Sequence, residues 1–130
     1  MIEPRWIQLQ TVTSLQSEAI AEHGGLRGIR DQGALLSAMS RAQNRFAYEA
    51  DTDVAQLAAA YGFGLARNHP FTDGNKRIAF IAMTLFLGLN GHSLSSTRID
   101  EIETMLKLAA GELAEDELAA WIRAHIEPRG

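Results

Sequence analysis

The sequence predicts an all-α domain, a compact helical bundle around a buried central helix, with at most a small β element. The run from residue 78 to residue 91 is apolar on nearly every side and closes with Asn90 and Gly91, which favour the end of a helix. Flanking segments repeat apolar residues at helical spacing and are separated by glycines or capping residues. The 130 residues, 46% of them hydrophobic, suit a single domain over residues 1–130.

The first elements are an extended segment and a helix. Residues 6–12 alternate apolar and polar side chains, a pattern that favours a short strand or extended chain. Thr13 and Gln16 have the spacing of a capping box, so we expect a helix to begin there. The glycines after His23 predict that this helix ends at about residues 23–25.

A second helix is expected to start after Asp31, whose side chain suits the N-cap position. Its apolar side is predicted to contain Leu35, Leu36 and Met39. Residues 44–50 are then predicted to form a loop with two aromatic side chains. Phe46 and Tyr48 in this loop are candidates either for contact with a target protein or for the core.

A third helix is predicted from about residue 53 to residue 68, capped by Asp51 or Thr52. It is rich in alanine and contains Gly62 and Gly64. Glycine inside a helix costs about 1 kcal/mol relative to alanine. We therefore expect another backbone to pack very close to these glycines; space for a ligand is the alternative.

The C-terminal third predicts a loop and two more helices. After a loop at residues 93–96, a helix over about residues 98–110 should end at Gly111. Its apolar face is predicted to contain Ile99, Ile102, Leu106 and Ala109. Acidic residues 115–117 suit the start of a final helix. The apolar side of that helix is predicted to contain Leu118, Trp121 and Ile122.

Composition narrows the class of protein. A net charge of −4 and a pI near 5.5 argue against direct nucleic-acid binding, which uses a basic surface. The absence of cysteine fits a reducing cytoplasm. The charged residues at positions 3 and 5 argue against a secretory signal, and no run is long and apolar enough for a membrane span. We therefore expect a cytoplasmic protein without membrane contact.

The segment His69-Pro70-Phe71-Thr72-Asp73-Gly74-Asn75-Lys76-Arg77 contains the chemistry of the chain. It joins an imidazole, a carboxylate, a flexible turn and two cations to the start of the apolar helix. The first N–H groups of a helix lack internal acceptors, and the helix dipole is positive there. Because that dipole disfavours cations, Lys76 and Arg77 indicate that an anion binds beside them.

Each residue type suits phosphate chemistry. His69 is the candidate general base, because the pKa of an imidazole ordinarily lies near physiological pH. Asp73 is a hard oxygen ligand suited to Mg²⁺ that bridges phosphate oxygens. The residues expected to act catalytically are His69, Asp73, Lys76 and Arg77. Those expected to bind the cofactor are Phe71, also an apolar anchor for the loop, Gly74, which permits positive φ, Asn75, Lys76 and Arg77.

Simpler interpretations remain for other residues. His23, His92 and His125 are each expected to be structural or solvated. A transition-metal site formed by His69 and Asp73 would lack a third nearby ligand.

The motif resembles the active-site loop of the Fic/Doc superfamily. The Fic branch has His-Pro-Phe-x-x-Gly-Asn-Gly-Arg-x-x-Arg, and the Doc branch has His-x-Phe-x-Asp-Gly/Ala-Asn-Lys-Arg. Lys76 stands where Fic proteins have glycine, and Phe80 stands where they have the second arginine, so both departures favour Doc. Similarity extends outward to residues 28–31, where Arg30 is a candidate support for the site or simply the start of a helix, and to residues 45–48, 59–63 and 86–91.

The resemblance implies a toxin of a type II toxin–antitoxin pair. Its expected reaction is Mg²⁺-dependent phosphoryl transfer from ATP to a hydroxyl of a target protein, elongation factor Tu, which arrests translation. The resemblance also implies a Phd-like antitoxin as inhibitor. The Fic-type inhibitory pattern is missing from the sequence, which favours an external inhibitor of this kind. Nucleotidyl transfer, the Fic reaction, is the main alternative, and a non-catalytic nucleotide- or partner-binding module is the second.

Overall fold

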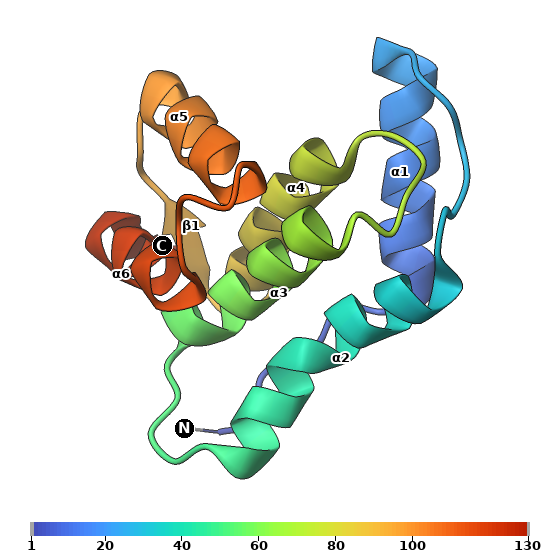
Figure 1. The fold of residues 1–130 in the computed structure, drawn as a ribbon. Helices are drawn as coiled ribbons and strands as arrows, with labels where there is room; N and C mark the ends of the chain where they lie inside the picture. The colour runs from blue at the N-terminus through green and yellow to red at the C-terminus, as the bar shows by residue number, and fades with distance from the viewer. Residues whose placement is uncertain (1, 130) are drawn as a thin grey trace.

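The computed structural model describes residues 2–129 and confirms the all-α prediction (Figure 1). Six helices surround one core, and a two-stranded sheet is the small β element within these residues. The elements are α1 (Leu9–His23), α2 (Gln32–Tyr48), α3 (Val54–Asn68), α4 (Asn75–Leu89), β1 (His92–Leu94), α5 (Arg98–Ala109), α6 (Glu115–His125) and β2 (Ile126–Pro128).

Helices α3 and α4 form the centre of the fold. They run antiparallel beside each other, with α2 and α6 packed against α3 (Figure 1). Both central helices bury much of their surface, as expected for helices that are apolar nearly all round. Tyr61 of α3 and Phe86 of α4 are fully buried, with ring centroids 5.2 Å apart. The predicted central helix, α4, is thus one member of a buried pair.

Two glycines of α3 mark the closest helix packing. A Cβ atom at Gly64 would lie 3.1 Å from the Cα atom of Ala38 in α2. A Cβ atom at Gly62 would lie 2.6 Å from Cγ of Met83 in α4. The expectation of close packing is confirmed, since neighbouring helices fill the space that a ligand would need.

The first helix begins earlier than predicted. Residues 2–8 form neither a helix nor a strand, and α1 starts at Leu9, so the prediction of a strand or extended segment is wrong for residues 9–12. The buried positions of α1, including Val12 and Gln16, recur every three or four residues, and this longer period overrides a short alternation. The capping box is also wrong, because Gln16 lies in mid-helix and its side chain bonds elsewhere. The predicted end at His23 is confirmed.

Helix α2 runs through the predicted loop. Asp31 caps it as expected, accepting a hydrogen bond from the Ala34 N–H. The helix continues to Tyr48 because tertiary contacts hold its last turn: Phe46 packs edge-on against Trp6, 5.7 Å between centroids. Leu36, predicted to be on the buried side, is exposed.

The N-cap of α3 lies one or two residues later than predicted. Asp53 is the cap, in place of Asp51 or Thr52, and forms a capping box with Gln56. Its second carboxylate oxygen accepts a hydrogen bond from Nε of Arg123 at 2.7 Å. Burial raises the pKa of Asp53, but the hydrogen bonds from Arg123 and the Gln56 N–H outweigh burial, so the net direction is downward.

We expect Asp53→Asn to lower stability at neutral pH and much less at acidic pH. A carboxyl with a lowered pKa in the folded state stabilises the protein above its unfolded pKa, and this contribution disappears as the pH falls through the folded pKa. The loss should be at most about 1 kcal/mol, because the pair with Arg123 is half exposed. Urea unfolding at pH 7 and pH 3 measures it. Asp51→Asn is the control, and an equal loss at both pH values would contradict the prediction.

The C-terminal third contains one clear error of the sequence prediction. Helix α5 buries Thr104, Met105 and Leu108. The predicted apolar face, by contrast, is open, with Ile99 72% exposed and Ile102 and Leu106 about half exposed. Ala109, the fourth predicted residue, is only partly buried.

The remaining C-terminal elements follow the prediction more closely. Helix α6 buries Leu118 and Ile122 as predicted, with Trp121 half-buried. Residues 93 and 94, predicted as loop, pair in β1 with β2 in the antiparallel register Ser93 to Glu127. In the described part of the chain, no helix is both long and apolar enough to cross a membrane.

Candidate active site

The motif loop connects the two central helices. His69 ends α3 in the left-handed conformation (φ 47°, ψ 55°), and its side chain is exposed. Pro70 and Phe71 turn inward, and Phe71 is only 1% exposed. Phe71 therefore anchors the loop in the core as expected, and its contact with a cofactor stays a prediction.

Asn75 closes the loop through its side chain. Its Oδ1 accepts a hydrogen bond from the Phe71 N–H at 2.9 Å, and its Nδ2 donates to the Phe71 carbonyl at 2.9 Å. One of the two amide hydrogens is thereby engaged, and the second is the one that can reach a phosphate. Gly74 has the expected positive φ of 81° at the N-cap of α4, a conformation that glycine adopts at little cost.

The N-terminus of α4 is strongly positive. Its first turn contains Lys76 and Arg77 and no acidic residue, and both cations are exposed. Within residues 2–129 neither of them forms an ion pair. Because the helix dipole also favours negative charge here, the arrangement favours an anion such as phosphate.

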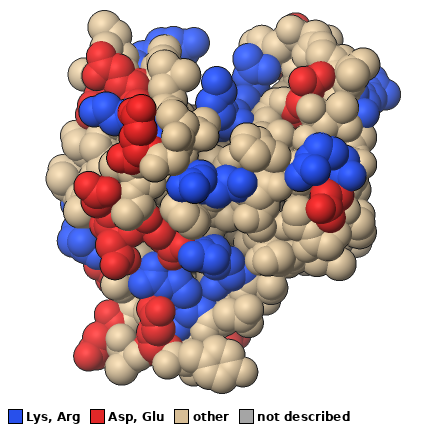
Figure 2. All heavy atoms as spheres, in the orientation of Figure 1, with Lys and Arg blue, Asp and Glu red and all other residues tan. Residues whose placement is uncertain are grey.

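The same two cations border a groove of about 460 Å³ between α4 and α5. The groove is lined by Lys76, Arg77, Phe80, Arg98, Glu101, Ile102, Met105 and Leu106. Figure 2 shows basic side chains along the middle of this face, with acidic side chains on the side of α5 and α6. The protein therefore has a locally basic surface although its net charge is −4.

Asp73 lies on the loop with one carboxylate oxygen engaged. Its Oδ2 accepts a hydrogen bond from the Leu26 N–H at 2.7 Å. Its Oδ1 makes no hydrogen bond within residues 2–129, and the residue is only partly buried. A single free carboxylate oxygen fits Mg²⁺, which is commonly held by one or two carboxylates together with substrate phosphates and water. Asp73 is therefore the residue that would hold the ion.

Residues 28–31 pair with the motif loop. Ile29 forms an isolated antiparallel bridge with Phe71, and the Thr72 N–H donates to the Gly28 carbonyl at 3.0 Å. The Arg30 and Asp31 N–H groups both donate to the Pro70 carbonyl, at 2.8 and 3.1 Å. Residues 28–31, which resemble Doc proteins in sequence, therefore form one side of the candidate site with their backbone.

Arg30 also holds the end of α3 through its side chain. Its Nε donates to the His69 carbonyl at 2.6 Å, and its Nη2 donates to the Asn68 carbonyl at 3.0 Å. Carbonyls at a helix C-terminus lack internal partners, so the guanidinium satisfies them and fixes the left-handed turn at His69. Of the two interpretations of Arg30, the geometry favours support of the site.

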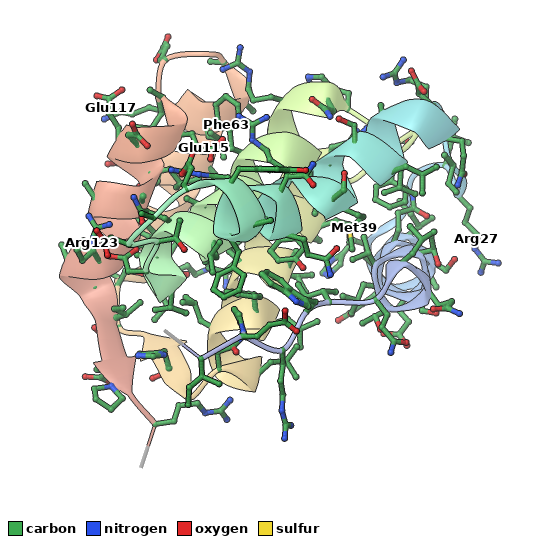
Figure 3. All side chains as sticks on the ribbon, turned by 90° about the horizontal axis from the view of Figure 1, so that it is seen from below. Arg27, Met39, Phe63, Glu115, Glu117 and Arg123 are labelled. Carbon is green, nitrogen blue, oxygen red and sulfur yellow. The ribbon has the colours of Figure 1, made fainter. Side chains whose placement is uncertain are left out.

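We expect Arg30→Met to lower the rate of group transfer about tenfold while the protein stays folded. A left-handed non-glycine residue costs roughly 1–3 kcal/mol, so His69 should leave its orientation when the two bonds are lost. Steady-state rates of the variant and the parent measure the effect. Arg27→Met is the matched control, because Arg27 points away from the ribbon (Figure 3) and forms no ion pair in residues 2–129. Equal losses in the two variants would contradict this role.

Phe46 and Tyr48, the two aromatic candidates for target contact, have different environments. Phe46 is partly buried and packs against Trp6 at the edge of the core, whereas Tyr48 is 87% exposed. The three other histidines fit the structural expectation. His92 and His125 bond to nearby backbone carbonyls, and His23 lies beside Glu22.

Comparison with known proteins agrees with the geometry. The Fic/DOC family model matches residues 6–87, which include the whole motif loop. The chain is 33% identical over 119 residues to the protein kinase doc of Escherichia phage P1, covering 92% of this chain and 94% of that protein. It is 36% identical over 100 residues to the toxin Doc of Mycolicibacterium smegmatis, covering 75% and 77%. The chain therefore belongs to the Fic/Doc family, in its Doc branch.

Proposed function

We propose that this protein is the toxin of a toxin–antitoxin pair and transfers the γ-phosphoryl group of ATP to a hydroxyl of a target protein. The phage relative named protein kinase doc supports phosphoryl transfer, and the relative named toxin Doc supports the biological role. The observation that carries the proposal is the exposed His69 at one end of the motif loop, whose other end is the anion-attracting N-terminus of α4. The proposed target is elongation factor Tu, whose modification would arrest translation in the cytoplasm.

The proposed reaction uses the motif residues as follows. His69 accepts the proton of the attacking hydroxyl, whose oxygen bonds to the γ-phosphorus while the bond from that phosphorus to the bridging oxygen breaks and ADP leaves. The helix N-terminus, Lys76 and Arg77 stabilise the negative charge of the transferring group. Asp73 would hold Mg²⁺, which neutralises charge on the phosphates when it is bound.

Nucleotidyl transfer is the second candidate function. The same loop can direct a hydroxyl to the α-phosphorus of a nucleotide, in which case AMP or another nucleoside monophosphate is transferred. The exposed Lys76 at the anion site favours phosphoryl transfer, since glycine occupies this position in the Fic motif. The third candidate is a module that binds a nucleotide or a partner without turnover.

Intact-mass spectrometry of elongation factor Tu, incubated with this protein, ATP and Mg²⁺, tests the proposal. A mass gain of one phosphoryl group supports it, and a gain of one AMP moves the assignment to nucleotidyl transfer. ATP labelled on the α- or the γ-phosphate gives the same distinction by label transfer. Unmodified elongation factor Tu would contradict the target, and a panel of other cytoplasmic proteins would then separate a wrong target from the non-catalytic module.

A Phd-like antitoxin is the proposed inhibitor. Co-expression with a Phd-like antitoxin should restore growth, and the purified antitoxin should abolish transfer of the phosphoryl group to the target. Growth arrest that persists when the antitoxin is co-expressed would contradict inhibition of this protein by a Phd-like antitoxin.

A further inference from the structure

Gln16 of α1 is a buried amide that makes all its hydrogen bonds to two loops of the site. It is 2% exposed, and burial of an amide is unfavourable unless its polar atoms are bonded. Its Nε2 donates to the Asp73 carbonyl at 3.1 Å and to the Leu26 carbonyl at 3.3 Å. Its Oε1 accepts from the Gly28 N–H at 3.4 Å. One side chain thus joins α1, the loop after α1 and the motif loop.

These bonds form a closed ring around the Asp73 carboxylate. The Leu26 carbonyl accepts from Gln16, and the Leu26 N–H donates to Oδ2 of Asp73 at 2.7 Å. Gln16 in turn holds the backbone of Asp73. A Cβ atom at Gly25 would lie 3.3 Å from Oδ2 of Asp73, so the loop also packs tightly against the carboxylate. Gln16 therefore bonds to both of the residues, Leu26 and Asp73, that are joined by the hydrogen bond to Oδ2.

The other buried polar residues of the described chain lack such a role. The hydroxyl of Thr104 donates to the Asp100 carbonyl inside its own helix. Thr52 lies just before the N-cap of α3, at the opposite end of that helix from the motif loop. Of these three buried polar residues, only Gln16 has a hydrogen bond to the motif loop.

We propose that Gln16 is a positioning residue that orients the Asp73 carboxylate toward Mg²⁺ in the nucleotide complex. The proposal rests on the proposed function, in which Asp73 holds that ion. Groups that hydrogen-bond to a metal ligand typically change metal affinity by about 10–100-fold when they are removed. Gln16→Met keeps the length of the side chain and removes all three hydrogen bonds. Thr104→Val is the control for loss of a buried polar group elsewhere.

The first measurement is calorimetric titration of ATP into the parent and each variant, with and without Mg²⁺, in the absence of a target protein. We expect Gln16→Met to weaken Mg²⁺-dependent binding about tenfold or more. Binding without Mg²⁺ should stay within about twofold, since Gln16 has no hydrogen bond to residues 74–77 of the anion site. Thr104→Val should match the parent in both. A folded Gln16→Met with parental Mg²⁺ dependence would overturn the positioning role while leaving the proposed function intact.

The second measurement is hydrogen exchange of the Leu26 N–H, which reports the bond to Asp73 without any ligand. This amide should exchange faster in Gln16→Met than in the parent and in Thr104→Val; unchanged exchange would overturn the role. If Gln16→Met does not fold, Gln16→Asn, whose amide is too short for the same bonds, takes its place. If ATP binding by the parent shows no dependence on Mg²⁺, the metal role of Asp73 fails together with this inference, whereas transfer from ATP is tested separately.

Discussion

Replacement of His69 by alanine is expected to lower the rate of group transfer by about 10²–10⁴-fold, the usual contribution of a general base. The imidazole is exposed and has no hydrogen bond within residues 2–129, whereas the backbone carbonyl of His69 accepts a hydrogen bond from Arg30. Loss of an exposed side chain without packing or bonds changes stability little. The expected result is therefore a folded protein that still binds ATP and fails in transfer.

The left-handed backbone at His69 calls for a second variant. Alanine adopts φ near 47° less readily than asparagine, which is enriched in this conformation. His69→Asn preserves the turn but cannot act as a base at neutral pH. If both variants lose transfer equally, the loss comes from chemistry, and if only His69→Ala loses it, the loss comes from the backbone.

Intact mass of the target protein over time measures the effect, with calorimetric ATP binding as the check on the site. His23→Ala is the matched control, because His23 is also an exposed histidine at a helix C-terminus. Transfer at the parental rate by His69→Asn would show that another group accepts the proton. Growth inhibition that survives in His69→Asn would favour the non-catalytic module.

The central pair of helices and the motif loop are predictable because their signals are local. The end of α4 at Asn90 and the positive φ of Gly74 follow from residue type. The anion site follows from the same local logic, since Lys76 and Arg77 stand at a position that the helix dipole disfavours for cations. The proposed chemistry depends on these residues, so most of the candidate site can be predicted from the sequence without the structure.

The errors of the sequence prediction arise where distant residues decide. Helix α2 extends past residue 44 because its last turn packs on the N-terminal segment and Nη1 of Arg45 bonds to Glu115, 70 residues away. Strand β1 forms only because Ser93 and its neighbours meet β2 near the other end of the chain. The spacing of apolar residues along a helix does not predict contacts between residues that are far apart in the sequence.

Gln16 and the apolar side of α5 show a second kind of limit. A glutamine three residues after a threonine matches a capping box in sequence, and only the surrounding fold shows that it is buried against two loops. Ile102 has the spacing of a core residue, yet it borders the open groove beside Lys76. Periodicity identifies an apolar face but does not identify what lies opposite it.

Gly62→Ala is expected to destabilise the protein by about 1–3 kcal/mol, the cost of adding volume to a packed core. The new methyl group would lie 2.6 Å from Cγ of Met83, a fully buried side chain, and 3.5 Å from Leu118 on another helix. Alanine is the better helix former by about 1 kcal/mol, so the steric cost must exceed that gain for the protein to lose stability. Met83 has little space to move into, because α3 and α4 are in contact along this face.

Gly33→Ala makes the identical change where there is room, and the two variants should differ in sign. Gly33 is exposed in the first turn of α2, and its added Cβ would meet only Oδ1 of Asp31, at an ordinary 3.5 Å. We expect stabilisation of up to about 1 kcal/mol from helix propensity and from the less flexible unfolded chain. Urea unfolding of the two variants, analysed with one transition, measures both effects.

A double-mutant cycle then tests whether Met83 is the cause. Met83→Ala alone leaves a cavity and should cost about 2–5 kcal/mol. The methyl group added at Gly62 would enter part of that cavity, so Gly62→Ala should be neutral or stabilising in the Met83→Ala background. If the cost of Gly62→Ala is the same in both backgrounds, the steric explanation is wrong and the helix backbone at Gly62, rather than its contact with α4, requires glycine.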